Sequence, residues 1–129
     1  MATIRRRIDA TQAEPLELYR HLIGVVAPRP IAWVSTIDGE GRVNLAPFSF
    51  SNLFGANPPI VAFSPVRRRD GSKKDTLLNV EEVGEFVWHA ATRALAERVN
   101  QTSAEQARGV SEAELAGLTL EPSEKVRPP

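Results

Sequence analysis

The order of apolar and polar residues along the chain predicts four short strands flanked by helical segments. Short apolar and β-branched runs bounded by Gly and Pro are typical of strands, whereas apolar residues three or four positions apart indicate helices. The predicted strands are 31–37, 42–46, 60–64 and 84–90, and the predicted helical segments are 15–22, 75–80 and the chain from residue 92 onward. Because strands joined by short turns pair antiparallel, we expect a small antiparallel sheet or an incomplete barrel.

Capping signals predict several helix ends. A Ser or Thr followed three positions later by Glu or Gln forms a capping box, in which each residue satisfies a free N–H group of the other. We expect capping boxes at Thr11 with Glu14, ahead of the helix at 15–22, at Ser103 with Gln106, and at Ser111 with Glu114. Gly24 and Gly117 are expected to end helices.

The first two predicted strands form a hairpin that leads to an unusual strand end. Residues 38–41 are a turn signal, and Pro47 lies just beyond the second strand. Because Pro has no N–H group to give to a central ladder, the strand must break or reach a sheet edge there.

Aromatic rings and hydroxyl groups alternate immediately after that proline. If residues 48–51 stay extended, Phe48 and Phe50 lie on one side while Ser49 and Ser51 lie on the other. This arrangement suits a flat ligand with a polar edge. The alternative is an ordinary strand end whose rings join the core while its hydroxyls cap backbone groups.

A basic loop precedes the predicted helix at residue 75. Residues 67–74 hold five basic residues in eight, and Asp75 and Thr76 follow directly. A phosphate group binds to positive charge, free backbone N–H groups and a hydroxyl, and a helix start of this composition offers all three. The alternatives are a solvated basic loop and a patch for nucleic acid or another polyanion. No nucleotide-binding glycine motif is present.

Composition narrows the possible chemistry. The chain has 129 residues with 42% hydrophobic and 25% charged residues, which predicts one domain over residues 1–129. Its formal net charge of +0 gives no global attraction to nucleic acid or to a membrane. The absence of cysteine excludes a thiol redox relay, so any electrons must travel on a cofactor. No apolar run approaches the length of a membrane span, and residues 1–9 contain none, so we expect a cytoplasmic protein.

Three motifs occur together in one order. They are 28–36 (PRPIAWVST), 44–49 (NLAPFS) and 74–76 (KDT). As a set they resemble the flavin reductase-like, FMN-binding split-barrel family, and more closely its flavoredoxin-like branch. The resemblance covers about residues 18–100.

The resemblance implies a mainly β fold with flanking helices, an FMN-binding split β-barrel. Family domains continue with further strands, so we expect this chain to be truncated before barrel closure, with its C-terminal strands missing. FMN is implied at a homodimer interface, with its phosphate at residues 74–76. The implied cofactor-binding residues are Trp33, Val34, Ser35, Thr36, Asn44, Ala46, Pro47, Phe48, Ser49, Phe50, Lys74, Asp75 and Thr76.

The implied activity is hydride transfer from NADH or NADPH to flavin, or passage of electrons through bound FMN. Because the flavin ring accepts the hydride itself, no catalytic side chain and no metal ligand are expected. His21 and His89 are interpreted as packed or surface residues. The alternative is a non-catalytic FMN-binding or structural homologue of the family.

Overall fold

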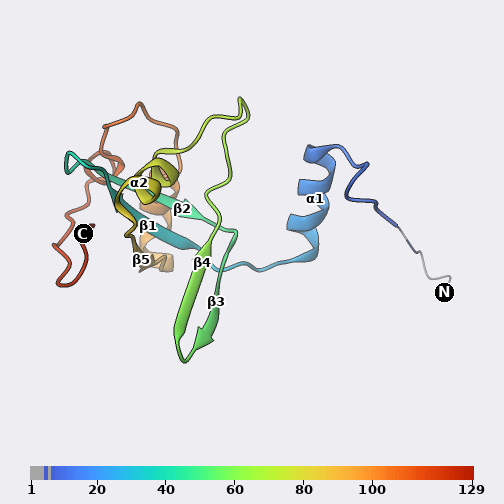
Figure 1. The fold of residues 1–129 in the computed structure, drawn as a ribbon, viewed down its shortest axis with the longest axis horizontal. Helices are drawn as coiled ribbons and strands as arrows, with labels where there is room; N and C mark the ends of the chain where they lie inside the picture. The colour runs from blue at the N-terminus through green and yellow to red at the C-terminus, as the bar shows by residue number, and fades with distance from the viewer. Residues whose placement is uncertain (1–4, 6) are drawn as a thin grey trace.

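A computed structural model describes residue 5 and residues 7–129 of the chain, so the expectation for the first nine residues lies partly outside the described part. In order, the elements are α1 (Pro15–Val25), β1 (Ala32–Ile37), β2 (Val43–Phe48), β3 (Ser51–Ala56), β4 (Pro59–Phe63), α2 (Asp75–Val83), β5 (Val87–Ala90), a short 3₁₀ helix η1 (Arg93–Leu95), α3 (Ala96–Gln101) and α4 (Glu112–Leu115). Figure 1 shows the sheets and α2 on one side and α1 set apart on the other.

Strand β1 is the centre of a three-stranded antiparallel sheet with the order β2-β1-β5. Val34 of β1 lies opposite Ala46 of β2 and Trp88 of β5. The predicted hairpin is confirmed, and its first strand is buried on both faces. Pro47 continues β2 opposite Trp33, which is possible because β2 is an edge strand.

The two faces of this sheet carry separate apolar clusters. On one face Ala32, Val34 and Phe48 are buried together with partly buried aromatic residues from β4 and β5. On the other face Trp33 and Leu45 pack with the α4 residue Ala113 and with apolar residues of the chain after β5. Helix α2 covers the first face, and α3 and α4 cover the second.

Two buried hydrogen bonds between side chains fasten α2 to the sheet. The Asn44 amide nitrogen donates to the Thr76 hydroxyl oxygen at 2.8 Å, and the Asn79 amide nitrogen donates to the Thr36 hydroxyl oxygen at 3.1 Å. All four side chains are buried. Since Thr76 lies in the first turn of α2, these bonds fix the start of the helix beside β2.

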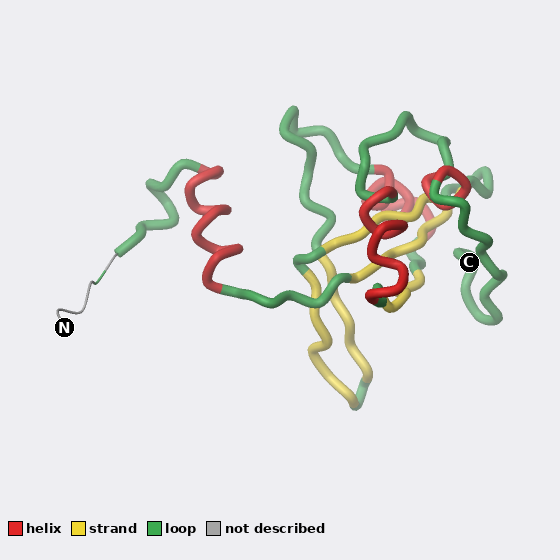
Figure 2. The backbone as a smooth tube through the Cα atoms, turned by 180° about the vertical axis from the view of Figure 1, so that it is seen from behind, coloured by secondary structure: helices red, strands yellow, loops and turns green. Residues whose placement is uncertain are grey.

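A second hairpin, β3 with β4, was not predicted. The sequence indicated one strand at 60–64 but none at 51–56. Both strands are largely exposed, so β3 has no alternation of buried and exposed residues that a sequence pattern could reveal, and a bulge between Leu53 and Gly55 shifts its register. The hairpin projects away from the sheet (Figures 1 and 2).

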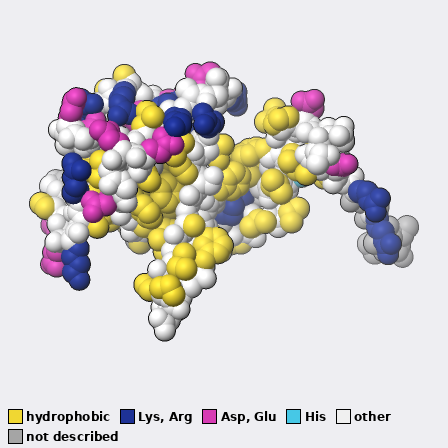
Figure 3. Space-filling model, viewed as in Figure 1, with side chains coloured by type: hydrophobic (Ala, Val, Ile, Leu, Met, Phe, Trp, Pro, Cys, Tyr) yellow, Lys and Arg dark blue, Asp and Glu magenta, His cyan; other side chains and the backbone are white. Residues whose placement is uncertain are grey.

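Apolar side chains remain exposed on two projections, the β3–β4 hairpin and α1. Leu53 and Phe54 on the hairpin are 63% and 67% exposed. Leu22 and Val25 on α1 are exposed as well. Figure 3 shows these apolar surfaces on the lower hairpin and on the helix at the right.

Helix α1 touches the rest of the chain through few contacts. The Tyr19 ring meets the Phe50 ring edge-on at 5.9 Å, and the Arg29 guanidinium lies 5.7 Å from the centre of the Phe50 ring. Gly24 does not end α1, which continues to Val25. The capping box expected at Thr11 is wrong because Thr11 bonds to Asp9 instead.

The remaining helix signals had mixed outcomes. Ser111 caps α4 by accepting a hydrogen bond from the Glu114 N–H, and Gly117 follows that helix with a φ of +62°. Ser103 begins no helix, because its hydroxyl donates to the Asn100 carbonyl at the end of α3. Helix α2 is longer than predicted and ends at Gly84, where φ is +78°.

The described strands form two separate sheets and do not close into a barrel. The mainly β architecture with helices is thus confirmed, while the described residues show an open form of it. In the same part of the chain no helix has both the length and the apolar character needed to cross a membrane.

The buried bonds that hold α2 can be tested by Thr76→Val. The change keeps the side-chain shape but leaves the buried Asn44 amide without its acceptor, so we expect the free energy of unfolding to fall by about 1–3 kcal/mol. Thr119→Val, at an exposed position, is the control and should shift it by less than about 0.5 kcal/mol. Equal losses in urea denaturation would show that the Asn44–Thr76 bond does not stabilise the fold.

Candidate functional site

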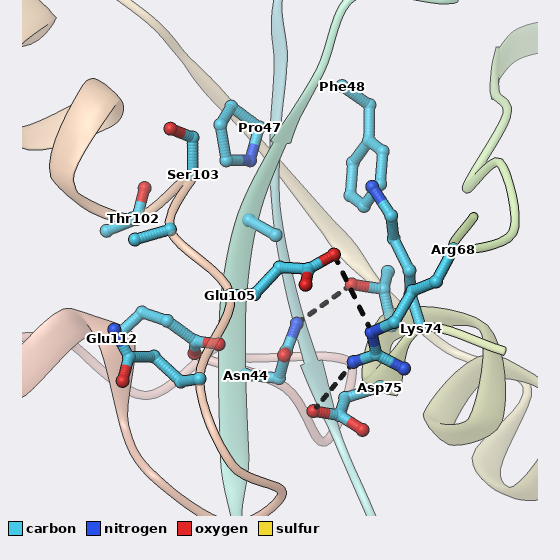
Figure 4. A pocket seen from close by; sticks show the side chains of 14 residues that line it. Asn44, Pro47, Phe48, Arg68, Lys74, Asp75, Thr102, Ser103, Glu105 and Glu112 are labelled. Atoms are coloured by element: carbon cyan, nitrogen blue, oxygen red, sulfur yellow. Dashed lines mark hydrogen bonds and ion pairs between the residues drawn. The ribbon is translucent and has the colours of Figure 1, made fainter. Parts of the chain in front are cut away.

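A cleft formed by two adjoining hollows lies where β2 meets the start of α2. The smaller hollow lies between β2, α2 and the loop after α3, and the larger extends to α1 and holds about 740 Å³. That volume is in the range of small-molecule sites, which span about 300–1,000 Å³. The residues shared by both hollows are Pro47, Phe48, Arg68, Lys74 and Glu105. Figure 4 shows the smaller hollow from close by.

The start of α2 gives the cleft its positive end. Lys74 immediately precedes the helix, and its side chain, which has no acceptor, leaves the first N–H groups of α2 uncapped. The Lys74 nitrogen lies 5.6 Å from the centre of the Phe48 ring. The first N–H groups of any helix lack partners within the helix, so this end of the cleft suits an anion.

The end of β2 gives the cleft its aromatic wall. The chain bends at Ser49 and Phe50, so the expected extended alternation of rings and hydroxyls is wrong. Phe48 turns into the core, with its ring 5.2 Å from that of Phe63, and the Ser51 hydroxyl donates to the Pro30 and Phe48 carbonyls. Ser49 and Phe50 line the larger hollow.

Many of the residues assigned to a cofactor from the sequence lie together in this cleft. Those that line it are Asn44, Ala46, Pro47, Phe48, Ser49, Phe50, Lys74, Asp75 and Thr76. They come from β2, the bend after it and the start of α2, segments that are close in space because the Asn44–Thr76 bond joins them.

The side chains of β1 do not line the cleft. Trp33, Val34, Ser35 and Thr36 are at most 4% exposed. The Trp33 indole donates to the Thr102 hydroxyl at 2.8 Å, and Thr36 accepts from Asn79. These residues therefore hold β2 in position without contacting the cleft themselves, because every position of β2 pairs with β1.

His89 is a packed residue, as interpreted from the sequence. Its Nε2 atom lies 2.9 Å from the Ser35 hydroxyl oxygen, and that hydroxyl donates to the Pro129 carbonyl. Burial lowers the pKa of His89, while its bond to the Pro129 backbone opposes the shift. The imidazole is thus favoured in its neutral form, away from the cleft.

Three charged residues of the cleft were not singled out from the sequence. Arg68 was one of several basic residues in its loop, and Glu105 and Glu112 fell in a region predicted as helix. No local pattern could reveal Glu105 and Glu112, because they reach the cleft through the path of the chain after β5. The described residues contain no group of His, Asp and Glu that could hold a metal ion.

Glu112 closes the outer edge of β2. Its carboxylate accepts a hydrogen bond from the Leu45 N–H at 3.1 Å, on the side of β2 that faces away from β1. Pro47, two residues on, presents the same side of the strand, so its missing N–H costs the sheet no hydrogen bond. Burial raises the pKa of Glu112, and the nearby charge of Asp75 adds to that shift.

Known protein sequences match most of this chain. The model of the family described as "Flavin reductase like domain" matches residues 26–129. The uncharacterized protein BH2278 of Halalkalibacterium halodurans is 50% identical over 113 residues, covering 88% of this chain and 54% of that protein. This chain therefore spans about half the length of the curated relatives it matches.

Solved structures show the same fold. Nitrilotriacetate monooxygenase component B from Bacillus cereus has a TM-score of 0.89 at 36% identity, over 99% of this chain and 63% of that one. A Shewanella frigidimarina protein with a split barrel domain has a TM-score of 0.72 at 26% identity, over 92% of this chain and 58% of that one.

The raised pKa of Glu112 predicts a pH-dependent stability. The folded state holds this proton more tightly than the unfolded state, so its contribution is fully present below the ordinary glutamate range and is lost as pH rises through the raised pKa. Glu112→Gln keeps an acceptor for the Leu45 N–H but cannot ionise. We therefore expect the variant to gain stability relative to the parent as pH rises from about 4 to 8.

Urea denaturation across this pH range measures the effect. Glu114→Gln, on the same helix but with an exposed side chain, is the matched control for the loss of one carboxylate. A constant difference between the Glu112→Gln variant and the parent would contradict the assignment.

Proposed function

We propose that this chain, which belongs to the flavin reductase-like domain family, binds FMN in the cleft and acts as an oxidoreductase that uses NADH or NADPH. The observation that carries the proposal is the joint presence, in one cleft, of Lys74 at the start of α2 and the aromatic wall formed by Phe48 and Phe50. The family match over residues 26–129 supports a flavin ligand.

The cleft residues fit the two chemically different ends of FMN. The phosphate would lie at Lys74 and the first turn of α2, which offer a cation and N–H groups without partners inside the helix. The flavin ring would lie along Ala46, Pro47 and the bend at Ser49 and Phe50, where apolar surface borders a hydroxyl.

Asn44 and the β1 residues hold other parts of the cleft in position. Asn44 holds Thr76, and thereby the phosphate end, through a bond of 2.8 Å. Trp33 through Thr36 hold the strand that carries the ring end. We infer that their contribution to FMN binding is positional.

Bound FMN supplies hydride acceptance from a nicotinamide, a reaction that needs no acid or base from the protein. The chain's own residues bind the phosphate, orient the ring against β2 and limit access to one side of it. The similarity to component B of a nitrilotriacetate monooxygenase supports an oxidoreductase. A non-catalytic FMN-binding homologue is the alternative.

We further propose that two copies of the protein associate through the apolar projections. The β3–β4 hairpin and α1 expose large apolar side chains, among them Phe54 at 67% and Val25 at 83%. Exposed apolar surface of this kind is typical of association sites. Figure 3 shows that the two projections flank one side of the molecule.

The phosphate position is tested by Lys74→Ala. Loss of a charge-assisted bond to the phosphate should weaken FMN binding by about 1.5–3 kcal/mol, roughly ten- to a hundredfold. Riboflavin lacks the phosphate and should bind with unchanged affinity. Lys73→Ala is the matched control, because Lys73 pairs with Glu81 at 2.6 Å and does not line the cleft. Equal losses for FMN and riboflavin in a fluorescence titration would refute the assignment.

The reaction is tested by mixing FMN-loaded protein with NADH or NADPH under argon. Hydride transfer should bleach the visible absorbance of the flavin, because the reduced ring loses that band. Reduction by dithionite is the control that shows the bound ring to be reducible. Protein that stays oxidised with both nicotinamides but is bleached by dithionite would support the non-catalytic alternative.

A further inference from the structure

Arg68 and Glu105 stand at the junction of three neighbouring hollows. Both residues line the two hollows of the cleft, and both line a third hollow beside Arg69 and Asp70. No other residue among the linings of these three hollows is common to all of them. A molecule entering the cleft from this side therefore passes this pair.

The Arg68 guanidinium lies between two carboxylates, those of Asp75 and Glu105. Its Nη2 atom lies 3.8 Å from the nearer Asp75 oxygen, and its Nε atom lies 3.9 Å from a Glu105 oxygen. Figure 4 shows the two carboxylates approaching Arg68 from different directions. Both separations exceed the length of a direct hydrogen bond, so the guanidinium keeps donor capacity for another anion.

Arg68 itself is fixed in place by the backbone. Its Nη1 atom donates to the Lys73 carbonyl, and its own N–H donates to the Ser72 carbonyl at 3.0 Å. The side chain is 24% exposed. Its positive charge is therefore presented to the cleft by a closed turn and does not depend on either carboxylate for its position.

The two carboxylates differ in how easily they can move away from Arg68. Asp75 is 14% exposed, lies in the first turn of α2 and also meets Arg108 at 3.5 Å. Glu105 is 75% exposed, lies in the irregular loop after α3, and within the described residues has Arg68 as its one ion-pair partner. Displacing Glu105 thus leaves the helix start and the Asp75 pairs intact.

We propose that Arg68 is a second cation of the phosphate site and that Glu105 is an internal competitor, which occupies Arg68 until a phosphate monoester replaces it. This inference rests on the proposed FMN function and adds a residue pair that controls access to the phosphate end. A phosphate monoester carries a charge of about −1.5 to −2 with three acceptor oxygens, against −1 for Glu105. The exchange therefore favours a ligand that carries a phosphate, while a flavin without phosphate gains nothing from Arg68.

Displacing Glu105 from Arg68 costs the protein little free energy of folding. An exposed ion pair of this kind contributes little to stability, because water and salt screen it. Glu105 can turn into solvent without uncovering a buried group. The same charge would repel weakly bound anions, so the pair selects for dianionic ligands.

The proposal is tested by Glu105→Gln, Arg68→Gln and the matched control Glu81→Gln. Glu81 forms a comparable exposed ion pair, with Lys73, outside all three hollows. Fluorescence titrations with FMN and riboflavin give the dissociation constants. Glu105→Gln should tighten FMN binding about two- to fivefold, which is the value of an exposed ion pair expressed as a ratio. Riboflavin affinity should not change.

Arg68→Gln should weaken FMN binding about tenfold or more without changing riboflavin binding. The gain of Glu105→Gln should shrink at salt near about 0.5 M, where surface charges are screened. If Arg68→Gln weakens riboflavin binding as well, the substitution has disturbed the fold. The proposal is then judged from the FMN affinity of Glu105→Gln. FMN binding by Glu105→Gln that is no tighter than that of Glu81→Gln would overturn the proposal.

Inorganic phosphate separates this inference from the flavin function. If the parent protein binds neither flavin, the proposed function fails, but phosphate should still raise its melting temperature, and raise it further in Glu105→Gln. Equal shifts in Glu105→Gln and Glu81→Gln would refute the Arg68–Glu105 exchange independently of any flavin.

Discussion

The hydrogen bonds that join α2 to the face of the first hairpin are the constraint on which the site depends. Asn44 and Thr36 come from β2 and β1, and their partners Thr76 and Asn79 lie one helical turn apart on α2. All four groups are buried, so breaking either bond leaves a polar atom without water. The helix therefore has one favoured position along the sheet, and its first turn lies beside the end of β2.

The cleft follows from that position. The basic loop must end where α2 begins, so Lys74 and Arg68 are brought to the aromatic end of β2. The loop after α3 forms the opposite side, and it is anchored where the Trp33 indole donates to Thr102 and where Glu112 accepts from Leu45. Both of these walls are thus attached to the first hairpin. Helix α2 is attached through one face of its sheet, and the chain after α3 is attached through the other face and through the edge of β2.

The hairpin and the helix at residue 75 could be predicted from the sequence, because each has a local signal, and part of the cleft lining could be predicted from the motifs that carry the family resemblance. Strand β1 lies in a run rich in β-branched residues, and α2 follows a loop rich in Arg and Lys. Strand β3 could not be predicted, since residues exposed on both faces follow no period. The roles of Glu105 and Glu112 were equally invisible, because they depend on contacts with residues far away in the sequence.

The most direct test of the account is a crystal structure of the protein with FMN. We expect the phosphate within hydrogen-bonding distance of Lys74 and of the first N–H groups of α2, with the flavin ring along the bend at Ser49 and Phe50. A structure in which FMN lies elsewhere, or in which its phosphate points away from residues 74–76, would contradict it.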